Sequence, residues 1–222
     1  MLDLVLKRPQ AAVPRILCIG AHCDDIEIGC GGSLLALQAL AQVKIDWVVC
    51  SGSVQRRMET EAAMLRLVDT AARGELIAAQ HRDGYFPADY AALKELIESL
   101  KRFAPDLILC HERDDRHQDH RIVNELVWNT FRDHVVLEYE IPKWDGGLGQ
   151  PNLYVPVTEA QARAKVAALL DSHHSQAPKD WFNSETFMAL LRLRGIECRA
   201  PSGYAEAFHA RKLRFTGFSS PT

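Results

Sequence analysis

One short stretch of the chain, residues 20–32, combines several glycines with side chains that could do chemistry. Within it, one imidazole and three carboxylates fall inside six residues, namely His22, Asp24, Asp25 and Glu27. Packing does not require such a cluster, and the carboxylates repel one another unless a cation lies among them. The composition of this stretch therefore predicts a site for a metal ion or a proton.

A glycine-rich turn after an apolar run also suggests nucleotide binding, but the details of this turn do not fit. Its glycines do not follow the G-x-G-x-x-G spacing, and no Gly-Lys-Ser/Thr sequence comes after them. Asp24 and Asp25 would repel a phosphate at the position where a phosphate loop presents bare backbone N–H groups. We therefore favour a metal site over a phosphate site.

A second polar cluster, residues 115–120, reads Asp-Arg-His-Gln-Asp-His. His117 and His120 are three residues apart, so one helical turn places them on the same side. Spacing alone predicts that His22, Asp25 and His120 bind one metal ion. Two imidazoles and one carboxylate leave a fourth position for water, which is typical of a catalytic zinc site, whereas structural zinc sites are closed and usually rich in thiolates.

Four further polar residues of the two clusters have predicted roles. Asp24 is adjacent to a predicted ligand, and we expect it to act as the general base, although a helix N-cap is the alternative. Protonated His117 is predicted to stabilise the oxyanion. Asp119 is predicted to orient a histidine ligand. Glu27 is predicted to hydrogen-bond the turn.

The two clusters need a scaffold that brings them together, and the apolar pattern of the chain predicts one. Strand-like apolar runs precede both clusters, at residues 15–20 and 105–110, and helix-like stretches follow both. Other strands are expected at residues 44–50, 75–79 and 135–139, and helices at residues 30–42, 56–73, 90–103 and 122–131. This alternation predicts an α/β fold with a mostly parallel sheet, whose ligand crevice lies at the carboxyl ends of the strands.

The pattern is looser after residue 139. A loop is expected at residues 144–149, an extended run at 152–157, and helices at 159–170 and near 184–194. We predict a single domain over residues 1–222, because this length can bury one good core. Residues 1–140 are expected to form that core, and residues 141–222 to shape the pocket.

Composition excludes several classes of protein. The net charge is −3 and no long basic run is present, which argues against nucleic-acid binding. No apolar run is long enough to span a membrane, and the first residues do not resemble a signal peptide. Six cysteines with no CxxC pair predict free thiols in a reducing, cytoplasmic protein. The expected partner is a small molecule.

Residues 21–34 resemble the AHPDD(x)E-x-G-x-GG-T/S-L signature of the PIG-L/LmbE-like deacetylases, and residues 115–121 resemble the second motif of that family, DxHxDHR. These enzymes are zinc-dependent and remove acetyl groups from N-acetylglucosamine conjugates and related amides. Weaker similarities follow in family order, with R-x-x-E at residues 56–59, PN-x-Y at 151–154, K…H-x-SQ at 165–176, and RG…YAE-x-F at 194–208.

Carried over to this chain, the resemblance implies His22, Asp25 and His120 as ligands of Zn²⁺ and Asp24 as the base. It implies that His117 stabilises the tetrahedral intermediate. Two substrate contacts also follow, Arg56 and His173, although the neighbouring Arg57 and His174 are equally available. The resemblance further implies a Rossmann-like three-layer fold with helices on both faces, an N-acetylated substrate, and frequent homo-oligomers. Other divalent ions also suit His/Asp sites.

Two other functions are consistent with the sequence. In one, Cys23, which replaces the usual proline of the family signature, is the nucleophile of a cysteine-dependent hydrolase. In the other, the metal only stabilises a non-catalytic binding module. The remaining histidines, His81, His111, His134 and His209, are given no role. The sequence also leaves open which amide is cut.

Overall fold

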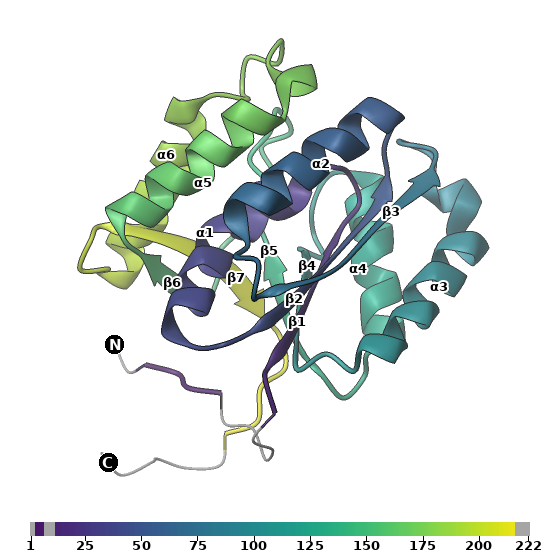
Figure 1. Ribbon diagram of the computed structural model, residues 1–222, viewed down its shortest axis with the longest axis horizontal. Coiled ribbons are helices and arrows are strands. Elements are labelled where there is room, and N and C mark those ends of the chain that lie inside the picture. The colour runs from purple at the N-terminus through teal and green to yellow at the C-terminus, as the bar shows by residue number, and fades with distance from the viewer. Residues whose placement is uncertain (1–2, 7–11, 216–222) are drawn as a thin grey trace.

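A seven-stranded sheet forms the centre of the computed structural model, which describes residues 3–6 and 12–215 (Figure 1). The strands are β1 (Arg15–Gly20), β2 (Lys44–Ser51), β3 (Arg73–His81), β4 (Leu107–His111), β5 (Val135–Tyr139), β6 (Leu153–Val157) and β7 (Tyr204–Ala210). Their spatial order is β3-β2-β1-β4-β5-β7-β6. The first five strands are parallel, and β7 runs antiparallel to both β5 and β6. The mostly parallel sheet predicted from the sequence is confirmed.

Helices cover both faces of this sheet. They are α1 (Asp25–Leu40), α2 (Val54–Leu67), α3 (Tyr90–Ser99), α4 (Gln118–Thr130), α5 (Glu159–Ser172) and α6 (Ser184–Cys198). The side chains of β1 alternate between two cores, with Ile16 and Cys18 packed on the side of α1, α2, α5 and α6, and Leu17 and Ile19 packed on the side of α3 and α4. Because both faces are buried, β1 reads as a continuous apolar run. The three-layer α/β fold is therefore confirmed.

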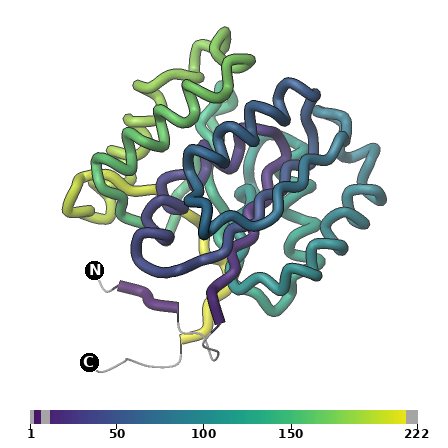
Figure 2. The backbone as a smooth tube through the Cα atoms, in the orientation of Figure 1, coloured from purple at the N-terminus to yellow at the C-terminus, as the bar shows by residue number. Residues whose placement is uncertain are grey.

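The strand order places a crevice beside β1. The chain moves outward from β1 through β2 to β3, then returns to pair β4 with the other side of β1. Helices and loops that follow β1 and β4 leave the sheet in opposite directions at this point, and ligands of open α/β sheets bind there. In the view of Figure 2, residues 3–6 and 211–215 are both seen at the lower left. Among the described residues, we find no helix both long and apolar enough to cross a bilayer.

Several element boundaries differ from the prediction. Helix α1 starts at Asp25 rather than near residue 30, so the glycine-rich stretch forms its first turns. Gly29 is required there, because a Cβ at this position would lie 2.2 Å from the ring of Tyr139 on β5. Helix α2 ends at Leu67 rather than near residue 73, and Arg73 already belongs to β3. Strand β7 was not predicted.

The C-terminal part joins this sheet through β6 and β7 and is also held to α1 by a buried ion pair. Lys165 Nζ on α5 lies 2.6 Å from Glu206 Oε1 on β7, and it donates to the carbonyl of Ile28 at 2.6 Å. The Glu206 carboxylate accepts from the backbone N–H groups of Gly32 and Ser33 at 2.8 and 2.6 Å. This pair therefore connects two C-terminal elements to the helix that carries Asp25.

Replacing Glu206 by alanine is expected to lower the free energy of unfolding by about 3–5 kcal/mol, because the ammonium of Lys165 stays buried without its partner. Urea unfolding measures this loss. The matched control is Glu159→Ala, which breaks the exposed pair with Arg163 on α5 and should cost less than about 1 kcal/mol. Equal losses in the two variants would contradict the role of the buried pair.

Candidate metal centre

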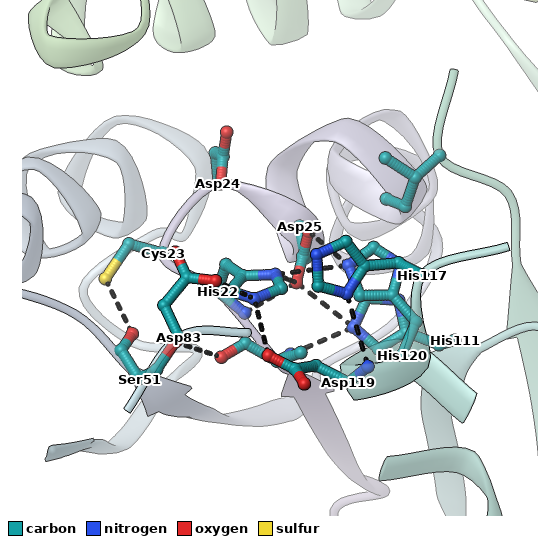
Figure 3. A network of polar contacts seen from close by, with 12 residues as sticks. His22, Cys23, Asp24, Asp25, Ser51, Asp83, His111, His117, Asp119 and His120 are labelled. Atoms are coloured by element: carbon teal, nitrogen blue, oxygen red, sulfur yellow. Dashed lines mark hydrogen bonds and ion pairs between the residues drawn. The ribbon is translucent and has the colours of Figure 1, made fainter. Parts of the chain in front are cut away.

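Three predicted ligands converge at the carboxyl ends of β1 and β4 (Figure 3). His22 lies in the turn after β1, Asp25 is the first residue of α1, and His120 lies in the first turn of α4. His22 Nδ1 is 3.1 Å from His120 Nε2 and 3.4 Å from Asp25 Oδ2. His120 Nε2 is 3.5 Å from Asp25 Oδ1. The fold thus brings two nitrogens and a carboxylate from two distant loops to one point.

Carboxylates on the far side of each imidazole fix its orientation. His120 Nδ1 is 2.9 Å from Asp115 Oδ2, which assigns the ring proton to Nδ1 and leaves the lone pair of Nε2 facing the cluster. His22 Nε2 is 3.1 Å from Asp83 Oδ1 and 3.4 Å from Asp119 Oδ2, which leaves Nδ1 facing the cluster. Asp119 thus lies where it can orient His22, as its predicted role requires. Both inward nitrogens therefore have the geometry of metal ligands.

The electrostatics of the cluster favour a positive charge at its centre. Burial opposes the charged form of His22, yet the carboxylates of Asp25, Asp119 and Asp83 raise its pKa well above the usual value. Burial and the neighbouring His111 lower the pKa of His120 to about 3, so this imidazole is neutral. A neutral imidazole and an ionised carboxylate are the forms that bind metals. Once His22 gives up its proton on metal binding, two imidazoles and one carboxylate fit a divalent ion with one open position.

His117 caps the helix that carries His120. Its Nδ1 accepts a hydrogen bond from the backbone N–H of Asp119 at 3.2 Å, so the neutral ring carries its proton on Nε2. The ring lies 4.8 Å from that of His22 and 4.7 Å from that of His120, centroid to centroid. Burial, and then the charge of His22, lowers the pKa of His117. Both effects favour the neutral ring, and the protonated His117 expected from the sequence stays a prediction.

Asp24 is buried at the start of α1, and its carboxylate points away from the imidazoles (Figure 3). It is the N-cap residue, but its side chain makes no capping hydrogen bond. Instead, Oδ1 accepts from Arg56 Nη2 at 2.6 Å. The neighbouring Arg57 lies beside Val54 and Met58 in a surface groove between α2 and β3. Of the two candidate arginines, Arg56 is the one that belongs to the site.

Comparison with known proteins agrees with this geometry. The family described as PIG-L, GlcNAc-PI de-N-acetylase, matches residues 17–131, which is slightly more than half of the chain. This chain belongs to the PIG-L family. It is also 30% identical over 181 residues to the uncharacterized deacetylase YaiS of Escherichia coli K12, a match that covers 76% of this chain and 96% of YaiS. These likenesses support a deacetylase.

Solved structures share the fold of this PIG-L chain. An N,N'-diacetylchitobiose deacetylase from Pyrococcus horikoshii matches with a TM-score of 0.69 and 21% identity, over 89% of this chain and 83% of that one. GalB from Pseudomonas putida KT2440, a 4-carboxy-2-hydroxymuconate hydratase, matches with a TM-score of 0.74 and 18% identity, over 94% and 100% of the two chains. Both likenesses show the fold alone, and one fold carries both reactions. The reaction must therefore be argued from the site.

Three polar residues of the site were missed by the sequence analysis. His111 ends β4, and its Nε2 lies 3.1 Å from Asp25 Oδ2 while its ring stacks on His120 at 3.8 Å between centroids. Asp83 follows β3 and contacts His22, and Asp115 contacts His120. His111 and Asp83 each lie at the carboxyl end of a strand, which is the signal that could have identified them.

His173 and Glu27 form a buried pair that the sequence did not predict. His173 Nε2 lies 2.9 Å from Glu27 Oε1, and both side chains are fully buried. Glu27 therefore bonds a C-terminal residue, and the hydrogen bond to its own turn stays a prediction. Since His173 is enclosed, it does not face solvent in this structure, whereas the neighbouring His174 is exposed. A substrate contact by His173 stays a prediction.

Cys23 lies between the site residues in sequence but has the environment of an inert thiol. It is fully buried, and its Sγ donates to the carbonyl of Ser51 at 3.2 Å. Burial raises the pKa of this thiol to about 11, so it is protonated at neutral pH. The thiolate is the reactive form of cysteine, and these surroundings disfavour it.

The Cys23→Ala variant is accordingly expected to retain deacetylase activity, with kcat/KM reduced less than about tenfold, or about 1.4 kcal/mol. Treatment of the wild-type enzyme with iodoacetamide at neutral pH should also leave its activity unchanged. Loss of all turnover in a folded, metal-loaded Cys23→Ala protein would support the cysteine-dependent alternative.

Proposed function

We propose that this PIG-L chain hydrolyses the acetamide of an N-acetylated sugar or glycoconjugate of the N-acetylglucosamine type, with release of acetate and a free amine. The observation that carries the proposal is the convergence of His22, Asp25 and His120 beside a further buried carboxylate, Asp24. The sugar class is supported by the relative from Pyrococcus horikoshii, which is a deacetylase of N,N'-diacetylchitobiose.

The residues that would hold the metal are His22, Asp25 and His120, and Zn²⁺ is the ion we propose, although other divalent ions suit the same donors. When bound, such an ion polarises a carbonyl and lowers the pKa of a coordinated water to about 7. Asp119 and Asp115 bond the outer nitrogens of the two imidazoles, so that His22 Nδ1 and His120 Nε2 would face the ion.

Asp24 is the proposed general base. It directly precedes Asp25, a proposed ligand, in the chain and is buried, and in this structure its carboxylate is turned toward Arg56 and away from the imidazoles. It would accept the proton of the attacking water and then pass it to the nitrogen of the leaving amine. Arg56 binds one oxygen of this carboxylate at 2.6 Å and so limits rotation of the side chain.

His117 is the proposed donor to the oxyanion. Because its Nδ1 accepts from the backbone of α4, the neutral ring presents Nε2–H, which can donate to the negative charge that develops on the acetyl oxygen. Arg56 and Asp83 supply polar groups for sugar hydroxyls next to the site. Asp83 suits this role because 59% of its side chain is exposed, although it also contacts His22.

The proposal also covers the domain organisation, the location and the partner of the protein. Residues 1–222 form one domain, in which residues 1–140 supply the Rossmann-like core and residues 141–222 shape the pocket. A cytoplasmic location is supported by the cysteines, since all six are free thiols. The partner is a small N-acetylated molecule, without nucleic acid, and homo-oligomers are consistent with the family.

Metal analysis and a substrate panel together test this function. We expect about one divalent ion per chain, and equal amounts of acetate and amine from at least one N-acetylated sugar. The same sugars carrying a free amine in place of the acetamide, and enzyme stripped by a chelator, are the controls. A preparation without bound divalent metal, or activity unaffected by complete metal removal, would refute the proposed mechanism.

Replacing Arg56 by glutamine is expected to lower kcat/KM by about 10–100-fold, because Asp24 loses the partner that fixes its carboxylate. Arg57→Gln is the matched control, since that residue lies in the outer groove and should leave kcat/KM close to the wild-type value. Similar losses of kcat/KM in both variants would show that the positive charge of α2, rather than the contact between Arg56 and Asp24, supports activity.

A further inference from the structure

The carboxylate behind His120 is bound from several sides. Asp115 is 4% exposed. Its Oδ2 contacts His120 Nδ1 at 2.9 Å, and its Oδ1 accepts from the backbone N–H of His117 at 2.7 Å. Both of its oxygens lie 2.9 Å from Lys143 Nζ. The lysine therefore binds both oxygens of the carboxylate that also contacts the imidazole.

Lys143 comes from the loop after β5 and is itself held in place. Its side chain is 13% exposed, its Nζ lies 3.3 Å from Asp145 Oδ2, and it donates to the carbonyl of Ile141 at 3.4 Å. The next residue, Trp144, donates from its indole nitrogen to Asp180 Oδ1 at 2.7 Å. This loop is thus attached both to the proposed metal centre and to the C-terminal part.

The positive charge of Lys143 also offsets the repulsion between Asp115 and the neighbouring carboxylates. The side chains that contact the two imidazole ligands include four carboxylates, those of Asp25, Asp83, Asp115 and Asp119. Without a cation beside it, Asp115 would be repelled by these groups and could turn away from His120 toward solvent. The ammonium of Lys143 opposes that rotation because it attracts both oxygens at once.

We propose that Lys143 is a positioning residue for the metal, which acts by holding Asp115 on His120 Nδ1 so that Nε2 presents its lone pair to the ion. This inference rests on the proposed function, since it assumes that His120 is a ligand. Lys143 itself touches neither the metal nor the substrate. Outer partners of metal-binding histidines typically contribute 10–100-fold to metal affinity.

The test measures metal binding in the absence of substrate. Lys143→Met is expected to weaken Zn²⁺ affinity by about 10–100-fold in competition with a chromophoric chelator, while Lys143→Arg, which keeps the charge, retains most of it. In Co²⁺-loaded protein, the visible absorption of Lys143→Met should differ from wild type, and Lys143→Arg should restore it. Lys101→Met, which breaks an exposed pair with Glu98, is the control and should change neither property.

A second variant separates positioning from general stability. Asp115→Asn should weaken Zn²⁺ affinity to a similar extent, and the double variant with Lys143→Met should be no weaker than the worse single variant, because both act through one contact. Thermal unfolding of the metal-free proteins checks that each variant folds. If folded Lys143→Met and Asp115→Asn proteins bind Zn²⁺ as tightly as wild type, with the same Co²⁺ spectrum, the inference is wrong. If wild type itself binds neither ion, the proposed function fails as well.

Discussion

The Asp24→Asn variant is expected to lose turnover while it keeps its metal. An amide cannot accept a proton as a carboxylate does, and loss of general base catalysis typically lowers kcat by about 10²–10⁴-fold. The amide oxygen can still accept the hydrogen bond from Arg56, so the local structure should be preserved. Acetate release, measured together with metal content, gives both quantities on the same preparation.

Asp83→Asn is the comparison for this experiment, because Asp83 is also a carboxylate beside Arg56 but is proposed to contact the sugar rather than to transfer a proton. It should change KM more than kcat. A metal-loaded Asp24→Asn enzyme with nearly wild-type kcat would place the base elsewhere, and the buried carboxylates around the cluster would then have to be tested in turn.

The His120→Ala variant is expected to lose both metal and activity. It removes one of three proposed ligands, and the two that remain cannot complete a site with an open position for water. The metal content after dialysis should fall from about one ion per chain to near zero, and no amine should be released. Elemental analysis and the amine assay measure these outcomes directly.

His174→Ala is the matched control, since that histidine is exposed and lies outside the cluster. It should keep the full complement of metal. If instead His120→Ala retains metal and turnover, the ligand set is wrong. Asp25 and His111, which together with His120 also offer ligand atoms within 4.8 Å of one another, would then be examined as parts of a different set.

Local patterns in the sequence determined the main features of this protein. Two imidazole–carboxylate clusters, each directly after an apolar run, predicted that His22, Asp25 and His120 would meet, because parallel strands bring their carboxyl ends to one edge of a sheet. The alternation of apolar runs and helical spacing predicted the α/β layers in the same way. The polar clusters and the apolar periodicity are both patterns of neighbouring residues, so they can be identified from the sequence alone.

Other features depend on contacts between distant segments, and only the tertiary structure decided them. His111 reaches Asp25, and Lys143 reaches Asp115, because β1, β4 and β5 are neighbours in a particular register. Glu27 pairs with His173 because α5 packs on α1 and both side chains are buried. No spacing rule along the chain encodes such contacts, since they depend on how the helices and strands pack against one another.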